Sequence, residues 1–259
     1  MKSPRVLQHV FTGALLASVG AMPVFAQAPA TPVDAPTPAS DWRKPVEDNQ
    51  VLTFVTLDQL EGRTNGPNTG FRWDGQGWIG TDFNKLWIKS EGRVINGVAS
   101  DGDHEFLYDR PIPHMRYLDW QAGARIDLDS GPTRAWAAIG VQGLAPYWFN
   151  FEPTIYVRDG GRVAGRLQGS YDLYLTQRLI LQPQVEMNFY SQADPARGLG
   201  TGLSDLDGGV RLGYQFSRKF APYVGCVYSG AFGQTATFSR KAGEPTTAHR
   251  FVFGVWLWH

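Results

Sequence analysis

The side chains that could bind a metal ion are few and widely spaced in this sequence. Beyond residue 26 there are two methionines, one cysteine and four histidines. Thioether and thiolate sulfur suit Cu(I), and imidazole suits Cu(II). No His-x-His or Met-x-x-Met spacing occurs. The candidate metal ligands are His104, His114, Met115 and His249.

His114 and Met115 are adjacent and follow Pro111 and Pro113, a composition typical of a turn. The pair could bind copper weakly where the ion enters, or it could be an ordinary solvated turn. His104 and His249 fall near expected strand ends, where a lone histidine is equally compatible with a plain surface position. We therefore expect any bound copper ion to be held weakly, and we expect no organic cofactor.

A larger set of reactive side chains consists of acids and bases that alternate with apolar residues. Between residues 178 and 190, Arg178 and Glu186 share one face, whereas Val185 and Phe189 share the other. These charges could form ion pairs that fill a narrow lumen, or they could line a cation path, because acidic linings favour cations. The charged residues expected to line the lumen are Asp119, Arg125, Asp127, Glu152, Arg158, Arg166, Asp172, Arg178, Glu186, Asp205, Asp207 and Arg211.

The alternation has a period of two, so it predicts β-strands and not helices. It is plainest in 171–192, which reads as two strands joined by a tight turn. Many expected strands reach about ten residues, which matches a tilted span of a bilayer and exceeds the usual soluble strand. The expected strands are 50–61, 70–81, 85–95, 103–110, 115–128, 134–145, 148–158, 162–175, 178–190, 203–216, 220–232 and 248–258.

The connections between these strands alternate in length. Tight turns such as 82–84 and 176–177 alternate with longer, glycine- and aspartate-rich segments. Long loops at one end and short turns at the other are typical of an outer-membrane barrel. The sequence therefore predicts an all-β fold, an antiparallel up-and-down transmembrane β-barrel of about 12 strands. The long loops are expected at 62–69, 96–102, 191–202 and 233–247.

Aromatic residues lie near several expected strand ends. They include Tyr147, Trp148, Tyr190, Trp256 and Trp258. Aromatic girdles mark the two membrane interfaces of such barrels. Packing inside a soluble core would also use aromatic residues, so this observation supports the barrel without deciding it.

The N-terminal residues are typical of a secretory signal. Lys2 and Arg5 precede an apolar run from Val10 to Val24, and Ala26 ends a small-residue cleavage site. We expect a signal peptide at 1–26, a disordered Pro/Ala-rich periplasmic linker at 27–49, and the barrel domain at 50–259. The expected location is the outer membrane of a Gram-negative cell.

Composition excludes some functions. The formal net charge is zero, which gives no support to a nucleic-acid partner. Cys226 is the single cysteine, so no internal disulfide framework exists; a small apolar strand residue is the favoured interpretation over a copper ligand. No G-x-S-x-G elbow occurs, and we expect no enzymatic activity. A general diffusion porin and an outer-membrane lipid hydrolase remain as rival readings.

Six segments carry a family resemblance through their order and spacing. They are DQLEGR (58–63), GWIGTDFNKLWIKSEG (77–92), RAWAAIGVQGLAPYWF (134–149), YDLYLTQRLILQPQVE (171–186), GLGTGLSDLDGGVRLGY (198–214) and FAPYVG (220–225). Over about residues 50–258 the chain thereby resembles the copper resistance protein B family. The resemblance implies an outer-membrane barrel that contributes to copper resistance by passing or weakly binding copper ions. It also implies contacts with outer-membrane lipid and with periplasmic copper-handling proteins.

This chain departs from that family in its N-terminal segment. Many relatives carry a Met- and His-rich stretch there, whereas residues 27–49 contain neither residue type. We therefore expect copper handling to lie in the barrel or its mouths.

Overall fold

The computed structural model describes residues 50–259, apart from 66–67, 96, 116 and 129–132. The expected signal peptide and linker lie outside the described residues. Within the described residues, three short 3-10 turns occupy Pro146–Trp148, Asp159–Gly161 and Pro195–Arg197. The strands and the α-helix are β1 (Leu52–Asn65), β2 (Asn68–Gly80), β3 (Lys85–Ile95), β4 (Val98–Pro111), β5 (Leu118–Asp127), β6 (Arg134–Ala145), β7 (Phe149–Arg158), β8 (Arg162–Ser170), β9 (Leu173–Tyr174), β10 (Leu179–Tyr190), β11 (Gly202–Tyr214), β12 (Phe220–Ala231), α1 (Gly233–Lys241) and β13 (Thr247–Trp258).

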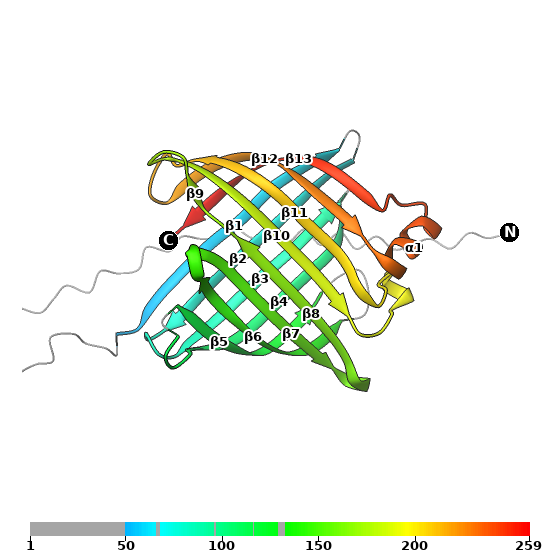
Figure 1. Cartoon of the computed structure of the whole chain (residues 1–259), viewed down its shortest axis with the longest axis horizontal. Helices are drawn as coiled ribbons and strands as arrows, with labels where there is room; N and C mark the ends of the chain where they lie inside the picture. The colour runs from blue at the N-terminus through cyan, green and yellow to red at the C-terminus, as the bar shows by residue number, and fades with distance from the viewer. Residues whose placement is uncertain (1–49, 66–67, 96, 116, 129–132) are drawn as a thin grey trace, which may run out of the picture. The chain divides into compact units, whose positions relative to one another are not determined.

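The strands close into one antiparallel barrel (Figure 1). Twelve long strands each pair with their neighbours, β1 pairs with β13, and the two-residue β9 extends the hairpin before β10. The start of β1 and the end of β13 lie together, because Val55 and His259 exchange backbone hydrogen bonds of 2.9 and 3.2 Å. We call this the terminal end and the opposite one the loop end. The predicted 12-stranded closed barrel is confirmed.

The outer face of the barrel is apolar. Val55, Phe71, Ile88, Phe106 and Phe253 point outward from their strands and are 43–58% exposed. An apolar exterior around a charged interior suits lipid and is the inverse of a water-soluble sandwich. Among the described residues, no helix is long and apolar enough to cross a membrane.

Two long loops predicted from the sequence are paired strand instead. β1 and β2 remain paired as far as Asn65 and Asn68, and β3 pairs with β4 as far as Ile95 and Val98. Their polar, glycine-rich residues resemble a loop, but backbone pairing in a closed sheet does not require apolar side chains. The predicted loops are therefore wrong for 62–65, 68–69 and 98–102, and residues 66–67 and 96 lie outside the described residues. Of the predicted loops 191–202 and 233–247, residues 191–201 and 233–246 do connect strands outside the barrel sheet.

The predicted strand 162–175 is also interrupted. β8 ends at Ser170, and the chain resumes pairing only at Leu173, opposite Leu181 of β10. The predicted tight turn at 176–177 is present, because Thr176 N–H donates to the Leu179 carbonyl at 3.3 Å.

The expected aromatic girdle is only partly present. Tyr147 and Trp148 lie at the terminal end and are 89% and 63% exposed, as interfacial residues should be. Trp256 is 4% exposed and faces inward, and Tyr190 and Trp258 line cavities of the lumen. The girdle interpretation is wrong for these three, because even-numbered residues of β10 and β13 point into the barrel.

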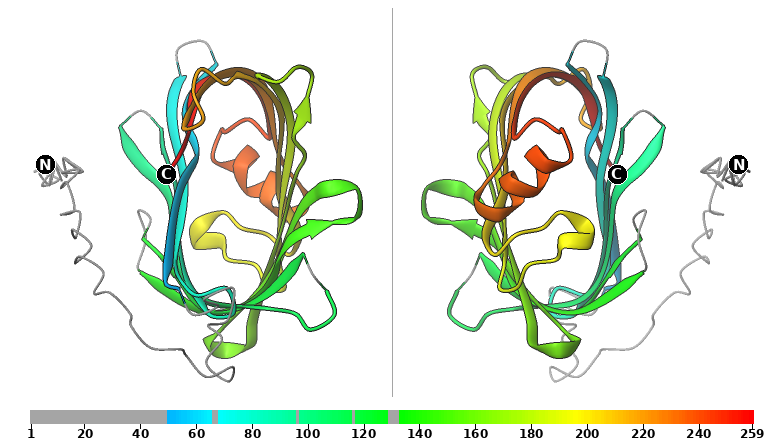
Figure 2. Two further views of the ribbon diagram at one scale, coloured as in Figure 1. Left: turned by 90° about the vertical axis from the view of Figure 1, so that its left-hand side faces the viewer. Right: turned by 90° about the vertical axis from the view of Figure 1, so that its right-hand side faces the viewer.

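The loop end is partly covered by two segments that the sequence did not predict as structured. Figure 2 shows α1 and the 191–201 segment lying within the outline of the barrel mouth. The buried Thr235 of α1 accepts the Gly200 N–H at 2.8 Å and lies 2.9 Å from Ser204. Asp194 pairs with Arg134 of the barrel wall at 2.5 Å. Both segments are therefore fastened to the barrel.

Candidate functional site in the charged lumen

A connected set of charged side chains crosses the middle of the lumen. Its members come from β1, β2, β3, β4, β5, β8, β10 and β11. Several of its contacts, such as those of Arg72 with Glu186 and of Arg166 with Asp103, join strands that do not pair with one another. Glu61, Arg63, Arg72 and Arg211 are each at most 2% exposed. We call the set the central belt; its members are Glu61, Arg63, Arg72, Glu91, Asp103, Arg125, Arg166, Glu186, Asp207 and Arg211.

Glu61 anchors one side of the central belt. Its Oε1 accepts hydrogen bonds from Arg63 Nε at 2.7 Å and from Arg211 Nη2 at 3.1 Å. Its Oε2 accepts from Arg211 Nε and from the Tyr223 hydroxyl, both at 2.9 Å. Buried charges require such complete pairing, since an unpaired one would be costly. β1 and β11 are thereby tied together across the two strands that separate them in the sheet.

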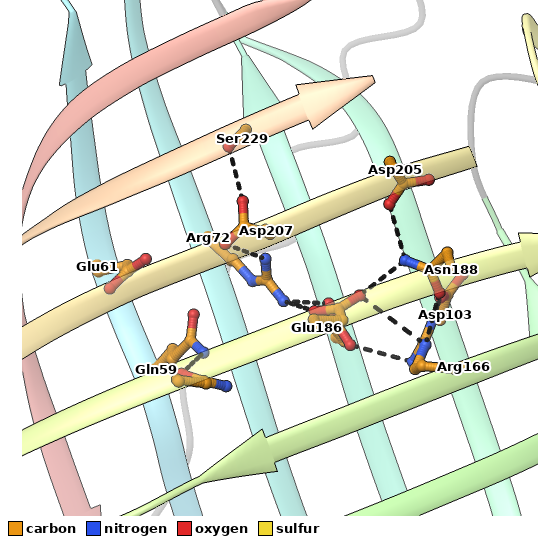
Figure 3. Close-up of polar contacts among 12 residues, drawn as sticks. Gln59, Glu61, Arg72, Asp103, Arg166, Glu186, Asn188, Asp205, Asp207 and Ser229 are labelled. Carbon is orange, nitrogen blue, oxygen red and sulfur yellow. Dashed lines mark hydrogen bonds and ion pairs between the residues drawn. The ribbon is translucent and has the colours of Figure 1, made fainter. Parts of the chain in front are cut away.

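Arg72 points toward Glu186 and Asp207, which lie on strands that do not pair with its own (Figure 3). Its Nη2 lies 2.5 Å from Glu91 Oε1 and 2.7 Å from Glu186 Oε2, and its Nη1 lies 3.6 Å from Asp207 Oδ1. These partners belong to β3, β10 and β11. One guanidinium therefore connects opposite walls of the barrel.

Arg166 and Arg125 continue the belt to the other wall. Arg166 Nη1 lies 3.2 Å from Glu91 Oε2, and Arg166 Nη2 also binds Asp103. Arg125 Nη2 lies 2.6 Å from Asp103 Oδ2, and its Nε donates to Asp127 at 2.7 Å. Shared carboxylates thus link β2, β8, β4 and β5 in one network.

Three cavities follow one another along the lumen. The loop-end vestibule has a volume of about 570 Å³, the small central cavity about 50 Å³, and the terminal vestibule about 320 Å³. Glu91, Asp103 and Arg166 line both of the first two. Asp74 and Glu152 line both of the last two, so the cavities lie end to end.

The charge of the cavity walls changes along this line. Among described residues, the loop-end vestibule is lined by eight arginines and seven acids. The central cavity has five acids and two bases, and the terminal vestibule has three acids and no base. The central and terminal parts are therefore suited to cations.

The carboxylates of Asp58, Asp74 and Glu91 form a row through the acidic part of the lumen. A β-bulge at Asp58 of β1 turns the Asp58 side chain inward beside Gln59. The side chains of Thr56 and Gln76 donate hydrogen bonds to the Asp58 carboxylate at 2.9 and 2.5 Å. Asp74 of β2 pairs in register with Glu91 of β3. Two like charges directly opposite each other repel.

Asp74 differs from its neighbours in the row. No described side chain lies within hydrogen-bonding or ion-pairing distance of its carboxylate, although Asp58, Glu91 and Arg72 are close enough to act on it electrostatically. Gln76 Oε1, on the same strand, is buried and likewise has no hydrogen-bond partner among the described residues. This stretch of the wall presents oxygen atoms to the cavity.

Most of the charged residues expected in the lumen lie on inward faces. In or beside the central belt lie six of them, which are Arg125, Asp127, Arg166, Glu186, Asp207 and Arg211. Toward the terminal end, Asp119 pairs with Lys85 at 2.8 Å and Glu152 pairs with Lys89. Arg158 and Asp205 line the loop-end vestibule.

Arg178 and Asp172 depart from the expectation. Arg178 is exposed and lies in the turn before β10, so it does not line the lumen as its parity suggested. Asp172 is exposed between β8 and β9, although it accepts a 2.8 Å hydrogen bond from Gln182. In both cases the strand ends before the alternation does, so parity no longer fixes the direction of the side chain.

The four candidate metal ligands are not brought together. His104 is on the outward face of β4, and His249 is exposed on β13, where its ring lies 5.2 Å from that of Tyr228. His114 and Met115 are exposed in the turn between β4 and β5, where His114 has a φ of 68°. In the described part of the chain, no three His, Cys, Asp or Glu residues are placed to share a metal ion.

Sequence reasoning missed four residues of the central belt, Glu61, Arg63, Arg72 and Asp103. The bulge at Asp58 shifts the parity of β1 by one residue, so the alternation there looked irregular. The inward position of Arg72 could have been predicted, because Arg72, Asp74 and Gln76 form a series of even-numbered polar residues in β2.

The sequence of the whole barrel matches a family model described as Copper resistance protein B precursor (CopB), over residues 51–259. The chain belongs to this family. It is 40% identical over 213 residues to copper resistance protein B of Escherichia coli, covering 82% of this chain and 71% of that protein. A copper resistance protein B homolog of Pseudomonas syringae pv. tomato (strain ATCC BAA-871 / DC3000) is 38% identical over 213 residues, covering 82% and 72%.

The barrel is also similar to a solved structure, the NanC porin. The TM-score is 0.52 at 14% identity, and the match covers 80% of this chain and 99% of NanC. At this identity the likeness concerns the fold alone. The family resemblance expected from the sequence is confirmed, and the chain is a transmembrane β-barrel of the copper resistance protein B family.

Proposed function

We propose that this chain contributes to copper resistance as an outer-membrane barrel whose lumen passes copper ions and binds them weakly on the way. Family membership supports the link to copper, since the E. coli relative is named a copper resistance protein. The family and the porin-like fold favour a non-enzymatic role. The loop end would face the outside and the terminal end the periplasm, as in other bacterial barrels.

The observation that carries this proposal is the acidic central and terminal part of the lumen. Asp58, Asp74 and Glu91 lie on three adjacent strands, and Asp74 has no ion-pair partner among the described residues. A cation between Asp74 and Glu91 would offset their mutual repulsion. A site that passes an ion must not hold it tightly, and separate carboxylates meet that need.

The direct test is copper flux into proteoliposomes that contain the full-length barrel and enclose a copper-sensitive dye. We expect flux above that of empty liposomes, and Asp74→Asn should lower it several-fold by removing the charge. Asp159→Asn is the matched control, because Asp159 has the same side chain but is 87% exposed in a turn. Asp74 makes no ion pair with the described residues, so its replacement should leave the fold intact.

Two outcomes would contradict the proposal. One is wild-type flux equal to that of empty liposomes, and the other is equal flux through Asp74→Asn and wild type. In cells, deletion of the gene should lower growth on graded copper but not on zinc or silver. Deletion of residues 27–45 should leave copper tolerance almost unchanged, because that segment has no Met or His.

The fold likeness to NanC supports a second candidate, a general diffusion porin. That function would give conductance for many small ions and no copper phenotype on deletion. Comparing copper, potassium and chloride flux in the same liposomes separates the two functions.

A further inference from the structure

Four arginines gather around one carboxylate where the loop-end vestibule meets the central belt. They are Arg250 of β13, Arg63 of β1, Arg72 of β2 and Arg93 of β3, on four consecutive strands. Arg63, Arg72 and Arg93 all act electrostatically on Asp207, and Arg250 is close to Asp207 as well.

The four arginines differ in the residues that lie next to them. Arg63 and Arg72 are also paired with carboxylates of the central belt. Arg93 lies directly opposite Arg72 in the register of β2 and β3, so two like charges face each other across the ladder. Arg93 and Arg250 both line the vestibule.

Arg250 belongs to none of the ion pairs of the central belt. Its one hydrogen bond with a described residue is from Nη1 to Ser229 Oγ, at 3.1 Å, and no described carboxylate lies within ion-pairing distance. The Ser229 hydroxyl donates a hydrogen bond to Asp207 Oδ2 at 2.7 Å, so towards Arg250 it is only a neutral acceptor. A guanidinium has five N–H donors, and most of those of Arg250 remain available in the vestibule.

We propose that the loop-end vestibule binds a small oxyanion, a carboxylate or phosphate compound, on Arg250 with Arg93 beside it. The planar fork of arginine matches the paired oxygens of carboxylate and phosphate. The vestibule, at about 570 Å³, has room for a compound of the size of citrate. Asp205 and Asp207 also line the vestibule, and their negative charges repel an anion. The bound compound is therefore expected to contact mainly Arg250.

This site goes beyond copper passage and does not depend on it. An oxyanion there would neutralise the positive side of the vestibule directly above the acidic central cavity. Because its binding is measured without copper, failure of one proposal leaves the other standing.

The test is calorimetric titration of citrate, orthophosphate and chloride into the full-length barrel in detergent micelles without copper. We expect saturable binding of citrate or orthophosphate, and at least tenfold weaker binding to Arg250→Gln. Arg218→Gln is the matched control, since Arg218 is exposed in the turn at the terminal end, and it should bind as wild type does. Chloride, which cannot use the arginine fork, should bind far more weakly.

A second measurement needs no variant. Phenylglyoxal modifies accessible arginines, and citrate or phosphate should protect Arg250 but not Arg218 in the wild-type protein. The proposal is overturned if neither oxyanion binds saturably, if Arg250→Gln binds as tightly as wild type, or if Arg218→Gln loses as much affinity. Equal modification of Arg250 with and without oxyanion would overturn it as well.

Discussion

Replacement of Glu61 by Gln should be among the most destabilising conservative changes in the barrel. Glu61 is fully buried, and each of its two oxygens accepts two hydrogen bonds. Whichever oxygen becomes the amide, two donors lose their acceptor and face an NH₂ group. One of the two is always a guanidinium N–H of Arg211, and the other belongs to Arg63 or Tyr223.

The size of the effect follows from these lost contacts. Leaving a buried donor unsatisfied costs about 1–3 kcal/mol, and breaking a buried ion pair costs about 3–5 kcal/mol. We therefore expect the free energy of unfolding to fall by about 3–5 kcal/mol for Glu61→Gln. Asp159→Asn makes the same chemical change at an exposed pair and should cost less than about 1 kcal/mol.

The measurement is urea unfolding in detergent micelles, followed by tryptophan fluorescence and by the gel mobility of the folded barrel. A Glu61→Leu, Arg211→Met double variant adds a check, because replacing both partners of a buried pair should cost less than the sum of the single changes. If Glu61→Gln unfolds within about 0.5 kcal/mol of the wild type, the carboxylate is hydrated and the central belt does not stabilise the barrel as described.

Three further changes test other parts of the structure. Cys226 is exposed on the outward face of β12, so in intact membranes it should react with an apolar maleimide and not with a charged one; equal labelling by both would place it in water. Gly92→Ala should cost about 1–3 kcal/mol, because its Cβ would come within 2.1 Å of the Trp73 ring, whereas Gly165→Ala meets only ordinary contacts; equal stability in urea would contradict this packing. Asp194→Asn should release the 191–201 segment from the wall, raising its rate of proteolysis with little change in barrel stability, and an unchanged rate would show that other contacts hold it.

The sequence predicts the strands well because the alternation of side chains is a local property. Strand β5 shows this, since Asp119, Arg125 and Asp127 all face inward as their parity requires. The alternation no longer predicts which way a side chain points where the strand is interrupted. The bulge at Asp58 hid Glu61 and Arg63, and the end of pairing before Leu179 turned Arg178 out of the lumen.

The partners of the lumen charges could not be predicted from the sequence at all. Arg72 binds Glu186, 114 positions away, only because β2 and β10 face each other across the closed barrel. Which inward residues meet depends on the stagger of the strands and on the barrel diameter, and neither quantity is encoded in a local pattern. Helix α1 was missed for a related reason, since a nine-residue helix is stabilised by packing at the barrel mouth more than by its own propensity.

The central belt and the proposed copper path share one carboxylate, that of Glu91, which limits how the path can work. Glu91 binds both Arg72 and Arg166, so a cation can use it only in competition with two guanidinium groups. Asp74 has no such competitor among the described residues, and it lies on the terminal side of Glu91. In the proposed path, a copper ion would therefore meet its strongest resistance between the loop-end vestibule and Asp74, where Arg166 lines both adjoining cavities. Movement of Arg166 away from Glu91, and not release from a chelating site, would then set the rate of passage.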